Sequence, residues 1–145
     1  MLKIILSFMP DFNTYRRGRH CVFALHVHLV FVTKYRRRVF TSAHFKDMRD
    51  IFKKVCSDFS AELIEFDGED DHVHLLVHYP PKIALSSLVN SLKGVSSRRL
   101  RQMHPTLARR YWRGVLWSPS YFAASCGGAP LNIIKNYIEK QRTPN

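Results

Sequence analysis

The sequence predicts an α+β fold in which helices cover one face of a single antiparallel sheet. Residues 22–32 and 72–78 carry apolar side chains at every second position, a pattern typical of strands with one face in a core. Residues 42–59 and 85–101 instead repeat apolar side chains at intervals of three and four, which indicates amphipathic helices. A chain of 145 residues suits one compact domain, which we place at residues 21–145.

The first half of this domain is predicted to run strand, helix, strand, strand. The first strand is followed by a basic turn, residues 34–38, after which Thr41 or Ser42 can cap the first helix. The second strand, residues 61–66, leads into Asp67-Gly68, a dipeptide typical of hairpin turns. The third strand follows this predicted turn.

The second half is predicted to add a helix, a strand and a last helix. The fourth strand lies within residues 115–125, where Pro119 favours a sheet edge, and the last helix spans residues 129–142. The order β-α-β-β-α-β is the split βαβ arrangement of ferredoxin-like and RRM-like domains, in which the first and third strands are central neighbours. We expect both preceding helices on one face and an open opposite face that carries histidines.

The net charge of the chain limits the kinds of partner that the protein is expected to bind. The net charge is +12, from 23 Lys and Arg against 11 Asp and Glu, and a single acid, Glu139, follows Asp71. A domain that repels itself this strongly favours a polyanionic partner, with nucleic acid the first candidate and an anionic membrane surface the second. No apolar stretch approaches the roughly 18–20 residues of a membrane span. The three cysteines are odd in number and widely spaced, which suits a reducing cytoplasm.

Basic residues gather in clusters along the chain. Residues 1–20 show no sustained periodicity and end in Arg16, Arg17 and Arg19, so we interpret them as a basic, loosely docked N-terminal arm. Aromatic residues lie near the later clusters, which allows phosphate contacts beside base stacking on single strands. These aromatic residues are Tyr35, Tyr111, Trp112, Trp117 and Tyr121.

The sharpest local motif is His72-Val73-His74. Side chains two positions apart on a strand point the same way, so two imidazoles there can bind one divalent ion. Two hydrogen-bonded histidines without a metal would give the same pattern. His26-Val27-His28 has the same form, and local sequence does not distinguish the two pairs; a joint four-histidine site would favour zinc.

Tyr137 and Gln141 lie four residues apart on the last helix and therefore on one line of its surface. The pattern alone favours a tyrosine packed at the edge of the apolar stripe and a solvated glutamine, because amphipathic helices commonly carry such residues.

Several blocks in a fixed order resemble a known family, the single-tyrosine HUH transposases of bacterial insertion sequences, or IS200-like transposases. The resemblance covers roughly residues 20–141. The blocks are Lys34-Tyr35-Arg36-Arg37, Asp71-His72-Val73-His74-Leu75-Leu76, Leu92-Lys93-Gly94, Ser97-Arg98-Arg99, Leu116-Trp117, Gly127-Gly128-Ala129-Pro130-Leu131-Asn132 and Asn136-Tyr137-Ile138-Glu139-Lys140-Gln141.

This resemblance implies a metal-dependent transesterase. His72, His74 and Gln141 would bind a divalent ion, Mg²⁺ or Mn²⁺, and Tyr137 would be the nucleophile that forms a 5′-phosphotyrosine intermediate. The resemblance also favours His72 and His74 over the pair at residues 26 and 28. The implied substrate is single-stranded DNA, folded as hairpins at the ends of an insertion sequence.

The resemblance further implies a homodimer in which the tyrosine helix completes the partner's metal site. Gly127-Gly128 is a plausible hinge for this exchange. The residues expected to contact DNA are Lys34, Arg36, Arg37, Arg38, Lys93, Arg98, Arg99 and Trp117.

Two alternatives stay open at this point. A domesticated endonuclease with the same chemistry would act on chromosomal palindromes. A non-catalytic RRM-like module would bind single-stranded nucleic acid with the same fold and basic surface, but it would not need the histidine pair, Tyr137 and Gln141 together.

Overall fold

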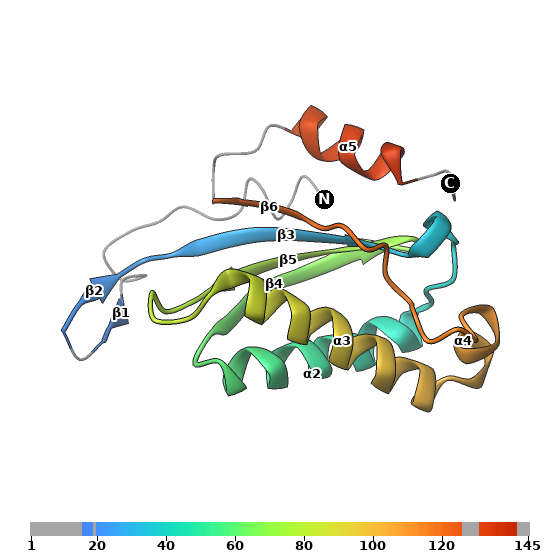
Figure 1. The fold of residues 1–145 in the computed structure, drawn as a ribbon, viewed down its shortest axis with the longest axis horizontal. Helices are drawn as coiled ribbons and strands as arrows, with labels where there is room; N and C mark the ends of the chain where they lie inside the picture. The colour runs from blue at the N-terminus through green and yellow to red at the C-terminus, as the bar shows by residue number, and fades with distance from the viewer. Residues whose placement is uncertain (1–15, 19, 126–130, 142–145) are drawn as a thin grey trace.

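A computed structural model describes residues 16–18, 20–125 and 131–141, and within 131–135 it describes the backbone alone. At its centre lies one four-stranded antiparallel sheet in the order β4-β5-β3-β6 (Figure 1). The strands are β3 (His26–Val32), β4 (Glu62–Glu69), β5 (His72–His78) and β6 (Phe122–Ser125).

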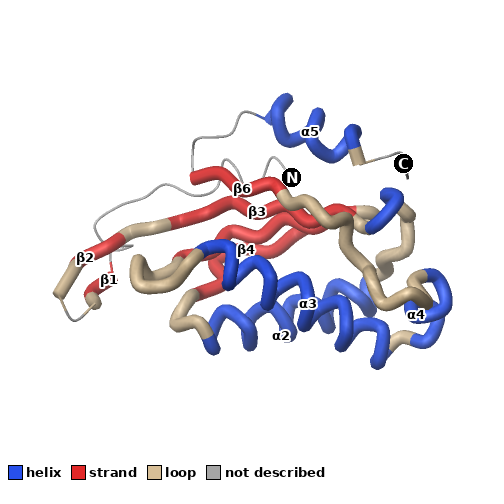
Figure 2. The backbone as a smooth tube through the Cα atoms, viewed as in Figure 1, coloured by secondary structure: helices blue, strands red, loops and turns tan. Residues whose placement is uncertain are grey.

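Helices lie on both sides of this sheet (Figure 2). α2 and α3 cover one face, and α5 lies on the other. The helices are α2 (Ser42–Asp58), α3 (Leu85–Met103), α4 (Pro105–Arg110) and α5 (Leu131–Lys140), and a 3₁₀ turn, η2 (Lys34–Arg36), follows β3. A short hairpin, β1 (Arg16–Arg17) with β2 (Val22–Phe23), precedes the sheet.

The predicted antiparallel α+β architecture is confirmed. β3 and β5, the predicted first and third strands, are paired at the centre, with Leu29 opposite Leu75. One face of these two strands forms the main core with α2 and α3, including Phe52 and Leu92. The predicted edge position of the fourth strand is also confirmed, because β6 pairs with β3 at the end of the sheet.

The prediction of an open opposite face is wrong. Every residue of β3 and β5 is buried. Val30 and Val32 pack against Ile138 of α5, so the last helix shields part of this face. At the other end of these two strands, histidine rings cover one another: His26 stacks on His78 with ring centroids 4.2 Å apart.

Several predicted boundaries also change. The predicted strand 22–32 is divided into β2 and β3, because β2 turns away to pair with β1. Asp67-Gly68 lies inside β4, and the turn falls three residues later at Asp70-Asp71. Pattern reasoning missed α4, although Pro105 suits a first helical turn and Leu107 is buried.

Two expectations fall outside the described residues: the Gly127-Gly128 hinge, and the N-terminal arm apart from residues 16–18 and 20. None of the helices that the structure describes has the length and hydropathy needed to cross a membrane.

Gly68 provides a test of the strand register. A Cβ atom on this residue would collide with the carbonyl oxygen of His72 and would lie 3.0 Å from the Phe45 ring. We therefore expect Gly68→Ala to destabilise the fold by about 1–3 kcal/mol, as other overpacking changes do. Urea unfolding measures this loss.

Gly94 is the matched control, since a Cβ there meets no atom of the described residues within 4 Å. Gly94→Ala in the exposed part of α3 is expected to stabilise the protein by roughly 0.5–1 kcal/mol through helix propensity. Similar effects of the two substitutions would contradict the close approach at Gly68.

Candidate functional site

His72 and His74 form a buried pair at the start of β5. Their side chains lie on the same face of the strand because they are two positions apart, and their ring centroids are 4.9 Å apart. Both residues are almost fully buried, with exposed fractions of 2% and 0%. The Nε2 atom of each ring is buried and has no hydrogen-bond partner among the described residues. Buried nitrogens of this kind suit a ligand such as a metal ion, because an unpaired buried polar atom is otherwise costly.

A carboxylate fixes the orientation of His72. Its Nδ1 lies 2.7 Å from Oδ1 of Asp71, and Oδ2 of Asp71 accepts a hydrogen bond from Nε of Arg36 at 2.9 Å. An ionised carboxylate only accepts, so Nδ1 of His72 carries a proton, and Nε2 is the ring nitrogen that is left to bind a ligand. Burial by itself would raise the pKa of Asp71, but hydrogen bonds and charge from His72 and Arg36 outweigh it and lower the pKa.

A second histidine orients His74. Nε2 of His28 and Nδ1 of His74 are hydrogen-bonded at 3.2 Å. Burial is the main cause that lowers the pKa of His74 to about 2 and that of His28 to about 4. Both rings are therefore neutral near pH 7, which is the form of imidazole that binds metal ions.

The second His-x-His motif is split between two places. Val32 pairs with His72 and His26 pairs with His78, so six strand positions separate His26 from His72, roughly 20 Å. His28 contacts His74, whereas His26 stacks on His78. The joint four-histidine site considered from the sequence is therefore not formed.

α5 brings Tyr137 and Gln141 onto the segment before β6. The Tyr137 hydroxyl and Oγ of Ser120 are hydrogen-bonded at 2.9 Å, and Oε1 of Gln141 accepts from Oγ of Ser118 at 2.7 Å. Burial raises the pKa of the Tyr137 phenol, and the Ser120 hydrogen bond partly offsets this effect. Both predicted side chains thus contact serines that sequence reasoning did not single out.

Arg36 connects the helix with the histidine site. Besides Asp71, it donates to both carboxylate oxygens of Glu139 in α5, at 3.1 and 3.3 Å. One guanidinium therefore joins the carboxylate that holds His72 to the helix that carries Tyr137. The sequence predicted a DNA contact for Arg36, but the structure shows that its donors are engaged within the protein.

Two further residues predicted to contact DNA, Lys93 and Trp117, also form hydrogen bonds within the protein. Lys93 donates from Nζ to three consecutive carbonyl oxygens, those of residues 118–120, at 2.8–3.2 Å, and burial lowers its pKa. Trp117 is a core residue that packs on Phe31 and donates to Oγ of Ser96, so its ring cannot stack on a base in this conformation. Each secures the segment that contacts α5. By contrast, Arg38, Arg98 and Arg99 are exposed.

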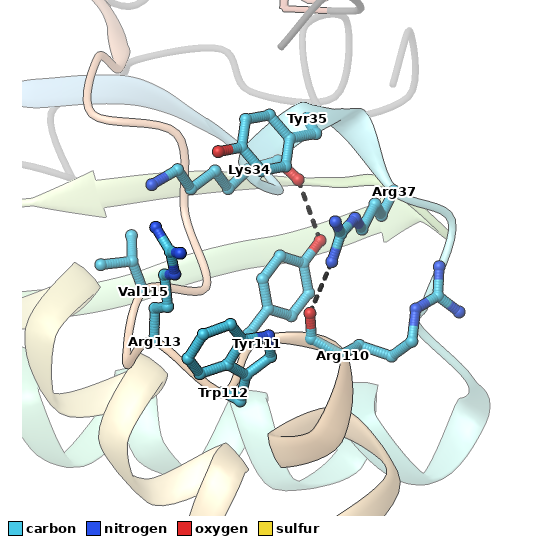
Figure 3. A pocket seen from close by; sticks show the side chains of 8 residues that line it. All are labelled: Lys34, Tyr35, Arg37, Arg110, Tyr111, Trp112, Arg113 and Val115. Carbon is cyan, nitrogen blue, oxygen red and sulfur yellow. Dashed lines mark hydrogen bonds between the residues drawn. The ribbon is translucent and has the colours of Figure 1, made fainter.

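A basic, aromatic pocket lies beside η2 and was missed as a unit by sequence reasoning (Figure 3). Its position depends on α4, which the sequence pattern did not predict. We refer to it as the η2 pocket; it is lined by Lys34, Tyr35, Arg37, Arg110, Tyr111, Trp112, Arg113 and Val115.

An overlapping group of possible metal ligands consists of Glu69, Asp71 and His72, whose ligand atoms lie within 4.8 Å of one another. Both oxygens of Asp71 already accept hydrogen bonds, from His72 and Arg36. The residues in this region therefore include a possible histidine-containing metal site, in which Asp71 is placed to orient a ligand.

Comparisons with known proteins agree on one family. Residues 21–141 match the family model described as "Transposase IS200 like". The chain is 34% identical over 126 residues to the ISDra2 transposase TnpA of Deinococcus radiodurans, which covers 87% of this chain and 90% of that protein. It is 32% identical over 114 residues to the transposase for insertion sequence element IS200 of Salmonella typhimurium, which covers 79% and 74%.

Two solved structures share the fold. A crystal structure of a proposed transposase from Deinococcus radiodurans R1 superposes with a TM-score of 0.81 at 33% identity, covering 88% of this chain and 98% of that one. A REP-associated tyrosine transposase bound to a REP hairpin superposes with a TM-score of 0.52 at 13% identity, covering 86% and 68%.

Asp71→Asn tests the carboxylate that holds His72. The substitution keeps the shape but removes the charge that pairs with Arg36, so we expect a loss of about 1.5–3 kcal/mol in unfolding free energy at pH 7. Its partners hold the pKa of Asp71 in the folded state below the ordinary value for an aspartate, so this contribution is complete above that ordinary value. It is lost as the pH falls through the folded-state pKa, and the wild type and the variant should then converge.

Urea unfolding in metal-free buffer at a series of pH values from about 2.5 to 7 measures the difference. Asp58→Asn is the control, since its pair with Lys54 is exposed and should contribute less than about 1 kcal/mol. A difference for Asp71→Asn that stays constant across this range would contradict the proposed ionisation.

Proposed function

The chain belongs to the IS200-like transposase family, and on this premise we propose that it cuts and rejoins single-stranded DNA with Tyr137 as nucleophile and His72 and His74 as metal ligands. Membership of the family establishes the transposase function. The observation that best supports these residue roles is a combination: both rings have a buried Nε2 atom with no hydrogen-bond partner among the described residues, and Asp71 and His28 hold their Nδ1 atoms. A buried Nε2 alone does not identify the site, since His78 has one too.

The donor set fits a divalent cation. His72 and His74 offer neutral nitrogens, and the amide oxygen of Gln141 offers a third, harder ligand once it leaves Ser118. Mg²⁺ or Mn²⁺ is the proposed ion, and when bound it would withdraw charge from the scissile phosphate. The Asp71 carboxylate then acts as the outer partner that holds the His72 ring and keeps its proton on Nδ1.

Tyr137 supplies the attacking oxygen. Its phenol is protonated at neutral pH, because burial raises a pKa that is already near 10, and the Ser120 hydrogen bond fixes its oxygen. Attack on phosphorus forms a bond from the tyrosine oxygen and breaks the bond to O3′ of the preceding nucleotide. The phenolic proton is released, the leaving oxygen takes up a proton, and the products are a 5′-phosphotyrosine and a free 3′-hydroxyl.

Rejoining is the same step in reverse. The phosphotyrosine keeps the energy of a phosphate ester, so the 3′-hydroxyl of another strand can attack it and release Tyr137 without a nucleotide cofactor. Two such transesterifications move a DNA segment. The charge of +12 supplies phosphate affinity, and the hairpin bound by the structural relative supports hairpin DNA as the folded substrate.

We also propose a homodimer in which the tyrosine helix of one chain serves the histidines of its partner. Within one chain, α5 is held to the sheet by Ile138 against Val30 and Val32 and by the pair of Arg36 with Glu139. In a two-fold dimer the same contacts would re-form against the partner's sheet.

The metal ligands can be tested separately from DNA binding. His72→Ala or His74→Ala should abolish cleavage of a single-stranded hairpin substrate and leave its binding largely intact, because affinity comes from Lys and Arg. Excess Mn²⁺ should raise the thermal stability of the wild type, by about 2.7 kcal/mol at one hundred times Kd, and should not do so in either variant.

His26→Ala is the control, since this ring lies at the far end of β3 from His72. It should retain both cleavage and the response to Mn²⁺. Equal losses in the His26 and His72 variants would contradict our choice of the histidine pair.

The nucleophile is tested by Tyr137→Phe, which removes one oxygen and retains the ring that packs on Phe122. Folding and DNA binding should survive, while the SDS-resistant protein–DNA adduct formed with Mn²⁺ should disappear. An adduct that persists in the Phe variant would identify another nucleophile.

The same variant distinguishes assembly in trans from assembly within one chain. A mixture of Tyr137→Phe with the double variant His72→Ala/His74→Ala should regain up to about a quarter of wild-type cleavage if sites form in trans and subunits exchange freely. The adduct should then lie on the histidine-variant chain. No recovery despite verified exchange would assign the site to a single chain.

A further inference from the structure

The η2 pocket has a volume of about 250 Å³, which is several times that of a water molecule. Its base is Tyr111, which is buried and donates from its hydroxyl to the carbonyl oxygen of Lys34 at 3.1 Å. Nη1 of Arg37 donates to the carbonyl oxygen of Arg110 at 2.5 Å (Figure 3). These two bonds join η2 and the residue after it to the end of α4 and to Tyr111, so hydrogen bonds fix the walls of the pocket.

Apart from Val115, the lining is basic and aromatic. The guanidinium of Arg37 lies over both Tyr35 and Tyr111, 5.2 and 5.4 Å from the ring centroids, and Arg113 lies 4.8 Å from the Trp112 centroid. No carboxylate lines the pocket among the described residues. An anionic, planar ligand would therefore meet cations and ring faces together.

Two of these rings are presented to solvent. Trp112 is 74% exposed and Tyr35 is 40% exposed, which are high values for large aromatic side chains. Tyr35 and Arg36 also both have positive φ angles, 64° and 53°. Non-glycine residues seldom adopt this conformation, and such strain concentrates at functional sites. Here it turns Tyr35 into the pocket while its neighbour Arg36 reaches Asp71.

We propose that the η2 pocket binds one unpaired nucleotide of the DNA substrate, with its base stacked on Trp112 or Tyr35 and its adjacent phosphates on Lys34, Arg110 and Arg113. The proposal rests on the proposed function for the identity of the polymer. The lining itself supports a single-stranded ligand, because a base offers a ring face only when it is unpaired.

The location gives this nucleotide a defined place on the substrate. η2 lies between the pocket and the histidine site: Lys34, Tyr35 and Arg37 line the pocket, while Arg36 holds Asp71, which holds His72. A strand with one base in the pocket would therefore lie against the same turn that holds the His72 ring through Arg36 and Asp71. By holding one base, the pocket would fix the position of the DNA strand along its length and so decide which phosphate lies beside Tyr137.

Tryptophan fluorescence tests the stacking directly, because the chain has two tryptophans and Trp117 is buried. A dT oligonucleotide of about ten residues should quench the emission of the wild type by stacking on Trp112. Trp112→Phe retains only Trp117 and should show no quenching. A blunt DNA hairpin with the same number of nucleotides, whose loop is a non-nucleotide linker so that every base is paired, should not quench either protein.

Affinity provides the second measurement. Trp112→Ala should weaken binding of the dT oligonucleotide by about tenfold and leave the blunt hairpin unaffected, since stacking of one base is lost. Trp112→Phe should fall between the Ala variant and the wild type. Arg113→Gln should reduce the slope of log K against log salt by about 0.7. Ile64→Ala, an exposed apolar residue on β4, is the control and should change nothing.

Quenching that persists in Trp112→Phe, or unchanged oligonucleotide affinity in Trp112→Ala, would overturn the proposal. An equal loss for the blunt hairpin would also overturn it, by showing a duplex surface instead. The adduct assay keeps the two proposals apart. If the adduct forms but substitution of Trp112 has no effect on binding or quenching, the pocket proposal is wrong and the proposed cleavage reaction stands. If the oligonucleotide quenches Trp112 but no adduct forms, the proposed reaction is wrong and the pocket proposal stands.

Discussion

The charged hydrogen-bond chain from Arg36 through Asp71 to His72 is the contact on which the rest of the site depends. It joins η2, the turn before β5 and, through Glu139, the helix α5. Each Asp71 oxygen accepts a hydrogen bond, one from the His72 ring and the other from the Arg36 guanidinium, so both oxygens of this buried carboxylate have a partner. Removing one partner would leave the other charge buried and unpaired, which is the costly case for a buried ion pair.

Burial sets the protonation state of His74 and His28. A fully buried imidazole is kept neutral, and the lowered pKa values of His74 and His28 follow from this desolvation. Neutral rings with one nitrogen engaged and the other unpartnered are prepared for a cation before it arrives. These rings lie on the two central strands, where every residue is buried, and α5 packs on the neighbouring Val30 and Val32.

The positive charge has two separate uses. Arg36 and Lys93 are bound to carboxylates and carbonyl oxygens inside the protein, where they hold α5 and the segment before β6. Other cations, such as Arg98 and Arg113, remain exposed and account for the affinity expected for phosphate. A net charge of +12 therefore overstates the surface that DNA meets, and the η2 pocket is where exposed charge coincides with exposed aromatic rings.

The sequence by itself determined the order of the four sheet strands and of the helices α2, α3 and α5, and the side-by-side placement of His72 with His74, because these follow from local periodicity. That order in turn predicted the central pairing of β3 with β5. The sequence did not determine which cations are free, since the partners of Arg36 and Lys93 are distant in sequence. Nor did it show that Trp117 is buried while Trp112 is exposed, because both are tryptophans within a few residues of Arg113. These outcomes depend on which surfaces α4, α5 and η2 cover, and only the tertiary packing of the chain decides that.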